Sequence, residues 1–215
     1  VWFTRLHDTD NGAFLRKDGM LCMAEDGVVT PFLAQKDVKL RGLHNIENLL
    51  AAAAAVWGLV PVEAIQQVGS TFTGVEHRIE PVRTLDGVLY YNDSIGTSPT
   101  RTIAGLRSFD QKIILIAGGY DKHIPYDVLG PEIAAHVKLL VCTGATGPKI
   151  AAAARAVPDA PEVLEIPDFY EAVHAAAQQA KPGDIVLLSP ASAAFDRFKN
   201  FMVRGAEFKK TVMAL

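Results

Sequence analysis

Residues 113–122 read IILIAGGYDK, and this stretch decides how the larger part of the chain folds. Its five consecutive apolar residues, Ile113–Ala117, predict a β-strand buried on both faces, because a half-solvated strand would alternate apolar and polar side chains. Such strands occur in parallel sheets, where crossover helices cover both faces. The two glycines end the strand, and Asp121 and Lys122 then place charged groups beyond its carboxyl end.

The alternation of strand and helix patterns continues around this stretch. Further strands are predicted at Ile79–Leu85, Val88–Tyr91, Leu139–Cys142, Val163–Ile166 and Ile185–Leu188. Helices are predicted at Pro99–Ser108, Val128–His136, Gly147–Ala156, Tyr170–Ala180 and Arg197–Ala214. Repeated strand–helix units of this kind predict an α/β fold with a doubly wound, mostly parallel sheet.

Residues 1–68 carry a different pattern. Short apolar runs alternate with three turn signals, at Asp10-Asn11-Gly12, Lys17-Asp18-Gly19 and Glu25-Asp26-Gly27. These signals predict two or three antiparallel strands joined by hairpins. His44 and Asn45 precede an Ala- and Leu-rich helix, and residues 62–68 predict a second, short one. Because both periodic patterns are lost afterwards, we place a domain boundary near Gly69.

The composition limits the classes of function. Of the 215 residues, 49% are hydrophobic and 21% charged, a balance that suits a globular protein with a sizeable core. The net charge of −3 gives no electrostatic reason to expect nucleic acid or an anionic membrane as a partner. No apolar run could span a bilayer and no signal peptide is visible, so we expect a cytoplasmic protein. Two widely separated cysteines, Cys22 and Cys142, suit a reducing compartment and are expected to be buried thiols.

The strand ends predict where a ligand would bind, because ligands of open α/β sheets lie beyond the carboxyl ends of the strands. Four such loops are rich in Gly, hydroxyl or charged residues: Asn92-Asp93-Ser94, Gly118–Lys122, Thr143–Gly147 and Ser189–Ser192. An ammonium at Lys122 suits a carboxylate or phosphate. The same residues also fit a plain strand-to-helix turn with a solvated Asp121–Lys122 pair. The loop TGATG at 143–147 lacks the spacing of the common phosphate-binding loops, so a tight turn or helix C-cap is favoured for it.

Other candidate residues lie nearer the boundary. Arg78 could fork onto phosphate or ribose oxygens, or it could form a surface ion pair. Asn45 and Asn48 share one face of a helix start, where Asn45 taken alone is better interpreted as the N-cap. The remaining histidines are scattered, so the spacing supports no metal site, and no Ser-His-Asp or Cys-His arrangement can be argued.

Five segments in order resemble the C-terminal half of the Mur ligases. They are GLHNIENLLAAAAA (42–55), FTGVEHRIEPV (72–82), YYNDSIGTSPTRTIAGL (90–106), ILIAGGYDK (114–122) and LLSPASAAFDRFKNFMVRG (187–205). The resemblance is strongest to the family member that adds D-glutamate. It implies that residues 1–68 are the incomplete C-terminal part of the family's central ATP-binding domain. Residues 69–215 would be its Rossmann-like C-terminal domain, which binds ATP and the amino acid.

The resemblance also implies an activity. ATP would phosphorylate the carboxylate of UDP-N-acetylmuramoyl-L-alanine, and the amine of D-glutamate would attack the acyl phosphate to form a precursor of peptidoglycan. The family's phosphate-binding loop and Mg²⁺ ligands are expected upstream, so this chain alone would be inactive, and a monomer is expected. There are two kinds of alternative. One is a non-catalytic module that binds a nucleotide or an amino acid. The other is another Mur ligase or a relative of folylpolyglutamate synthase.

By the same resemblance, residue roles carry over motif by motif. ATP would be bound by Asn45, Asn48, His77, Arg78 and Asp93, and D-glutamate by Thr97, Lys122 and Phe201; no catalytic residue or metal ligand is assigned within the chain. Two departures from the family pattern concern the amino acid. Ile95 replaces a common Lys, and Ala194 replaces a Ser that helps to hold D-glutamate. Ser192 stands at a position where Cys is usual. Whether its hydroxyl compensates for the loss at Ala194 is left open by the sequence.

Overall fold

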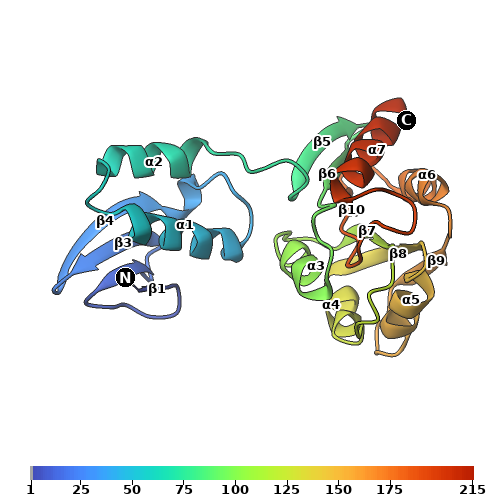
Figure 1. Ribbon diagram of the computed structural model, residues 1–215, viewed down its shortest axis with the longest axis horizontal. Coiled ribbons are helices and arrows are strands. Elements are labelled where there is room, and N and C mark those ends of the chain that lie inside the picture. Colours follow the sequence, from blue (N-terminus) through green and yellow to red (C-terminus); the bar gives the residue numbers. More distant parts are fainter. Residues whose placement is uncertain (1) are drawn as a thin grey trace. The chain divides into compact units, whose positions relative to one another are not determined.

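The structure, a computed structural model, describes residues 2–215. It forms two compact units, Val1–Gly74 and Val75–Leu215 (Figure 1). The division lies a few residues beyond Gly69, because helix α2 (Val62–Thr71) continues through that glycine. A Cβ atom at Gly69 would lie 2.4 Å from Leu33 Cδ2, so this glycine allows close helix–sheet packing and does not interrupt the helix.

The first unit holds a four-stranded sheet. Its strands follow the chain in the order β1 (Phe3–Thr4), β2 (Gly12–Leu15), β3 (Met20–Glu25) and β4 (Val28–Ala34). The β2–β3 and β3–β4 pairs are antiparallel, as predicted. The signal at Asn11-Gly12, however, makes no hairpin, because β1 runs parallel to β2. Gly12 instead begins β2 at φ 121°, against the carbonyl of Trp2.

Two helices cover one face of this sheet, after a 3₁₀ turn at Gln35–Asp37. Helix α1 (Leu43–Val56) and α2 bury Ile46, Leu50 and Ile65 against the strands. The predicted N-cap at Asn45 is wrong. Helix α1 begins at Leu43 after Gly42, whose φ of 91° only glycine adopts readily, and Asn45 lies within the first turn.

The second unit is the doubly wound sheet that the apolar runs predict. Its strands are β5 (Glu80–Leu85), β6 (Val88–Asn92), β7 (Ile113–Gly118), β8 (Val137–Thr143), β9 (Glu162–Glu165) and β10 (Ile185–Leu188). Their order is β5-β6-β10-β7-β8-β9, and every pair is parallel except the β5–β6 hairpin. All six residues of β7 are buried, which confirms the interpretation of the run at 113–117.

Helices cover both faces of this sheet (Figure 1). Helices α3 (Pro99–Leu106), α4 (Leu129–His136) and α5 (Gly147–Arg155) pack on the face that buries Ile113 and Leu115. Helices α6 (Phe169–Gln179) and α7 (Phe201–Ala214) pack on the face that buries Ile114 and Ile116. Helix α7 begins later than predicted, at Phe201, because the Asn200 side chain accepts a hydrogen bond from Val203 N and caps it.

Two further expectations concern the whole chain. Cys22 and Cys142 are both buried and free, as predicted, and burial raises the pKa of Cys142 to about 12. Among the helices of the described chain, none has the length and apolar character needed to cross a membrane.

Candidate functional site

The carboxyl ends of four strands meet at one edge of the second sheet. Leu188 of β10 pairs with Asn92 of β6 on one side and with Ile116 of β7 on the other, and Gly118 pairs with Thr143 of β8. The four loops selected from the sequence therefore emerge side by side. This edge is the candidate site.

Asp93, directly after β6, is a carboxylate inside the protein. Only 4% of its surface is exposed. Ser189 Oγ donates a 2.6 Å hydrogen bond to Asp93 Oδ2, and the Ile79 amide donates to Oδ1 at 3.3 Å. Burial raises the pKa of Asp93 to about 6, although both hydrogen bonds oppose the rise. Asp93 thus fixes the start of its loop, and its carboxyl group loses its proton less readily than an exposed one does.

Glycines make room for this carboxylate. A Cβ atom at Gly96 would lie 2.6 Å from Asp93 Oδ2, and one at Gly105 would lie 3.2 Å from the same oxygen. Both distances are shorter than ordinary carbon–oxygen contacts, so the loop and helix α3 approach Asp93 only because these residues lack side chains. Close packing against Asp93 therefore explains why both positions in the segment NDSIGTSPTRTIAGL are glycine.

Arg204 of α7 joins this loop to the one after β10. Its guanidinium is 2% exposed and donates to Ser94 Oγ, Ser94 O, Ala193 O and Ser192 O at 2.9–3.0 Å. Burial lowers the pKa of Arg204 to about 10, although the nearby carboxylates of Asp196 and Asp93 oppose the fall. Sequence reasoning gave Arg204 no role. The available signal was a lone charge in line with the apolar Phe208 and Val212 on one helix face.

The residues predicted to bind D-glutamate gather around the same loop. Lys122 Nζ donates to the Thr97 carbonyl at 3.0 Å, and Ser94 Oγ donates to the Phe201 carbonyl at 2.8 Å. Lys122 is exposed at the edge, whereas Thr97 and Phe201 are half-buried. The solvated Asp121–Lys122 pair is not formed, because Asp121 pairs with Lys149 at 2.6 Å.

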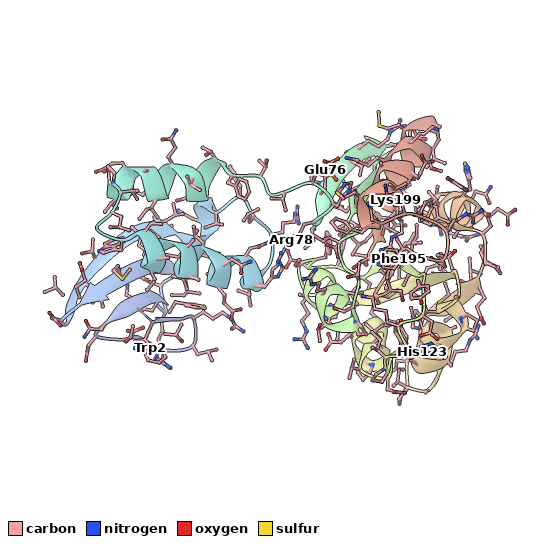
Figure 2. The ribbon with its side chains drawn as sticks, viewed as in Figure 1. Trp2, Glu76, Arg78, His123, Phe195 and Lys199 are labelled. Carbon is pink, nitrogen blue, oxygen red and sulfur yellow. The ribbon has the colours of Figure 1, made fainter. Side chains whose placement is uncertain are left out.

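The predicted nucleotide residues of the second unit differ in accessibility. His77 is 5% exposed, its Nδ1 lies 2.9 Å from Asn92 Nδ2, and its ring meets that of Phe201 edge to face. Arg78 is exposed on the segment leading into β5 (Figure 2), without a salt bridge among the described residues. Arg78 therefore offers an accessible guanidinium at this end of the unit.

The other two predicted nucleotide residues lie on α1 of the first unit. Asn45 is buried and donates to the Arg41 carbonyl at 2.7 Å. Its side-chain oxygen accepts a 3.1 Å hydrogen bond from Asn48, which is exposed. The two amides form one pair on the helix, as the i, i+3 spacing predicts, with Asn48 as the accessible member.

Both serines of the loop after β10 are turned inward. The Ser189 hydroxyl lies between Asp93 and Thr102, and Ser192 lies 2.9 Å from Tyr126 OH and 2.7 Å from Thr146 Oγ1. Ser192 is fully buried. Its hydroxyl is therefore engaged by two other hydroxyls within the protein.

A cavity of about 590 Å³ opens beside these loops. It is lined by Gly118, Gly119, Thr143, Gly144, Ala145, Pro167, Phe169, Asp196, Arg197, Phe198 and Arg204. The TGATG loop forms part of its wall as a tight turn, with Gly144 at φ 65°, and leads into the start of α5. That loop is thus a turn, one of the two structures favoured for it, and not a helix C-cap.

Near the boundary, Glu76, His77 and Glu80 bring three possible metal-ligating groups within 4.8 Å of one another. Lys209 of α7, however, donates to both carboxylates. This ammonium offsets part of their charge, so the cluster is an ion-pair network that ties α7 to Glu76 and to the start of β5.

Comparison with known proteins gives three results. The family described as "Mur ligase, glutamate ligase domain" matches residues 77–192. The chain is 51% identical to a UDP-N-acetylmuramoylalanine--D-glutamate ligase of Acetivibrio thermocellus, an alignment that covers 100% of this chain and 47% of that protein. It is 48% identical to the protein of the same name in Clostridium novyi, covering 98% of this chain and 46% of that one. The chain thus spans about half the length of the curated relatives it matches.

Solved structures agree on the fold. A UDP-N-acetylmuramate-alanine ligase of Thermotoga maritima matches with a TM-score of 0.67 at 14% identity, covering 94% of this chain and 46% of that one. A folylpolyglutamate synthase of Mycobacterium tuberculosis matches with a TM-score of 0.61 at 16% identity, covering 91% and 46%. At such low identity these likenesses concern the architecture alone.

Proposed function

This chain belongs to the Mur ligase family, and we propose that it is the C-terminal half of an ATP-dependent ligase that joins D-glutamate to UDP-N-acetylmuramoyl-L-alanine. We call that longer protein the complete ligase. The product is a peptidoglycan precursor made in the cytoplasm, and the complete ligase acts as a monomer. The names of relatives at 48–51% identity favour D-glutamate over the substrates of the distant structural neighbours.

The observation that carries the proposal is the contact between Lys122 and Thr97 at the carboxyl edge, where Nζ lies 3.0 Å from the carbonyl oxygen. D-Glutamate carries two carboxylates, and an exposed ammonium held at a fixed position is a suitable donor for one of them. Because both serines of the loop after β10 face inward, we assign no contact with the amino acid to their hydroxyls. Phe201, at the start of α7, would contact the amino acid instead.

Within this proposal the chain positions the amino acid. Lys122 and Thr97 hold a carboxylate of D-glutamate so that its amine lies against the activated carbonyl, which replaces a bimolecular encounter by a fixed approach. ATP supplies the phosphoryl group that activates the carboxylate of the other substrate. Arg78, accessible and without an ion-pair partner among the described residues, is suited to fork onto phosphate oxygens.

We divide the roles of the predicted nucleotide residues according to their exposure. Asn48 and Arg78 are exposed and would touch the nucleotide. Asn45, His77 and Asp93 are buried with internal hydrogen-bond partners, so they would hold the accessible groups in place. Mg²⁺ would be held outside this chain, whose sequence contains no G-x-x-x-x-G-K-[ST] loop.

The test is ADP release by the complete ligase with UDP-N-acetylmuramoyl-L-alanine present. We expect release to require D-glutamate and to give one amide product per ADP, whereas the 215-residue chain alone gives none. Release that depends on another amino acid, or on none, would overturn the proposed substrate. Ligation by the 215-residue chain alone would overturn its assignment as half of the enzyme.

A further inference from the structure

Three buried hydroxyl groups form a continuous chain beneath the candidate site. Tyr126 OH lies 2.9 Å from Ser192 Oγ, Ser192 Oγ lies 2.7 Å from Thr146 Oγ1, and Thr146 Oγ1 donates to the Gly119 carbonyl at 3.2 Å. We call Tyr126, Ser192 and Thr146 the hydroxyl chain. Their exposed fractions are 4%, 0% and 0%, so water does not compete for these hydrogen bonds.

The proton count fixes the direction of these bonds. Each hydroxyl donates once, and the Gly119 carbonyl can only accept. When Tyr126 donates to Ser192, Ser192 to Thr146 and Thr146 to Gly119, every donor finds an acceptor. With the opposite direction the Tyr126 proton would be left without an acceptor in this chain of contacts. The hydroxyl chain is thus an ordered relay of hydrogen bonds in which Ser192 is the central link.

The hydroxyl chain holds both ends of one loop. Gly119 begins the segment between β7 and α4, and Tyr126 lies near its end, with Lys122 between them. The Tyr120 amide adds a 2.9 Å hydrogen bond to the Ala193 carbonyl, next to Ser192. Residues 119–126 lie outside the helices and long strands, so hydrogen bonds and packing contacts fix their conformation. Besides the hydroxyl chain, these contacts include the ion pair of Asp121 with Lys149 and the packing of Tyr126 in the apolar core.

We propose that Ser192 is a positioning residue that places the Lys122 ammonium by anchoring the loop 119–126 through Tyr126 and Thr146. The proposal rests on the proposed function, since it assigns Lys122 to D-glutamate. Ser192 touches no substrate in this proposal, because its hydroxyl is fully buried and directed to two other hydroxyls. Its removal would leave the Tyr126 hydroxyl without this acceptor and weaken the attachment of the far end of the loop, although the Tyr126 ring stays packed in the apolar core.

The first experiment measures amide hydrogen exchange in the 215-residue chain. Ser192→Ala should accelerate exchange at residues 120–126 by about tenfold, the effect of one lost hydrogen bond. Ser108→Ala is the matched control, because the buried Ser108 hydroxyl bonds only the Ala104 carbonyl of its own helix end, at 2.8 Å. Equal exchange of residues 120–126 in both variants would overturn the anchoring. Tyr126→Phe removes the same link without altering the loop after β10, so it serves if Ser192→Ala does not fold.

The second experiment uses kinetics of the complete ligase. Ser192→Ala should raise KM for D-glutamate by about tenfold and leave KM for ATP within about twofold. In a Lys122→Ala background, the same change should have little further effect, because the anchoring acts through Lys122. Additive effects of the two substitutions would overturn the proposal.

The two experiments separate the possible failures. If the unaltered complete ligase does not use D-glutamate, the proposed function fails, and hydrogen exchange alone decides the anchoring. If it does use D-glutamate and Ser192→Ala behaves like Ser108→Ala in both measurements, only the positioning role fails.

Discussion

Lys122 and Thr97, 25 residues apart in the chain, are joined by a 3.0 Å hydrogen bond from the Lys122 ammonium to the Thr97 carbonyl. The bond links the loop after β7 to the loop after β6, although β10 lies between these strands in the sheet. A lysine that reaches across a strand in this way holds its charge over the centre of the candidate site.

Replacing Lys122 by Ala in the complete ligase should raise KM for D-glutamate by roughly 10- to 100-fold, because a charge-assisted hydrogen bond to a carboxylate is lost. KM for ATP should change by less than about twofold. Lys112→Ala is the matched control, since Lys112 Nζ also donates to a backbone carbonyl, that of Ala134 at 2.8 Å, at the opposite end of β7. Unchanged D-glutamate kinetics in Lys122→Ala would remove Lys122 from the site.

Asp93 should make the stability of the second unit dependent on pH. Its folded pKa of about 6 exceeds the ordinary value of 3.8, so the folded protein binds this proton more tightly than the unfolded chain does. The resulting stabilisation is complete below pH ~4 and is lost as pH rises through ~6. Asp93→Asn should therefore match the unaltered chain at pH ~4 and be more stable by about 1 to 3 kcal/mol at pH ~7.

The measurement is urea unfolding at both pH values, followed by amide NMR signals of the second unit. A stability difference that does not change with pH would show that Asp93 titrates normally. Glu162→Gln, at an exposed position on β9, controls for the loss of one carboxylate.

Gly205 should tolerate no methyl group. A Cβ atom there would lie 2.3 Å from His77 Nδ1 and 3.0 Å from Asn92 Nδ2, and both of these side chains are buried and bonded to each other. Gly205→Ala should destabilise the second unit by about 1 to 3 kcal/mol, despite a gain of up to ~1 kcal/mol in helix propensity. Gly147→Ala is the control, since its Cβ would meet no atom closer than 3.4 Å. Equal urea midpoints for the two variants would contradict this account.

Arg204→Lys should show that the guanidinium shape matters as well as its charge. A lysine ammonium cannot reach Ser94, Ala193 and Ser192 in the planar fork that Arg204 uses, so buried carbonyls would lose donors. We expect a loss of about 2 to 4 kcal/mol in the unfolding free energy of the second unit. Arg83→Lys is the comparison, because Arg83 also donates to two carbonyls, at the end of α7, but in a partly exposed place. It should lose less than about 1 kcal/mol, and a larger loss there than at Arg204 would contradict the prediction.

The sequence predicted the architecture of the second unit well, because its signals are local. Continuous apolar runs such as Ile113–Ala117 report a strand buried on both faces, and the residues that follow them identify the loops at its carboxyl edge. The family resemblance added a prediction of which residues bind the amino acid. Lys122, Thr97 and Phe201 lie around one loop, but their contact with the amino acid stays a prediction.

What the sequence did not reveal depends on contacts between distant residues. Arg204 and Ser94 are 110 positions apart, and no spacing rule relates them. Gly69 looks like a boundary in the sequence. Its real role, a close approach to Leu33, involves a residue far away in the chain and leaves no local signal. Asn45 looks like an N-cap in the sequence. The helix in fact begins after Gly42, which has a positive φ and provides no side-chain cap, and the local pattern does not reveal this.

The tryptophans and the tyrosines of the chain lie in different units. Both tryptophans, Trp2 and Trp57, belong to the first unit, whereas all five tyrosines belong to the second: Tyr90, Tyr91, Tyr120, Tyr126 and Tyr170. Tryptophan fluorescence excited at the red edge therefore reports on one unit, and tyrosine absorbance differences report on the other. Because coincident transitions by different probes are the test of two-state unfolding, this chain carries its own built-in reporters of whether its halves melt together.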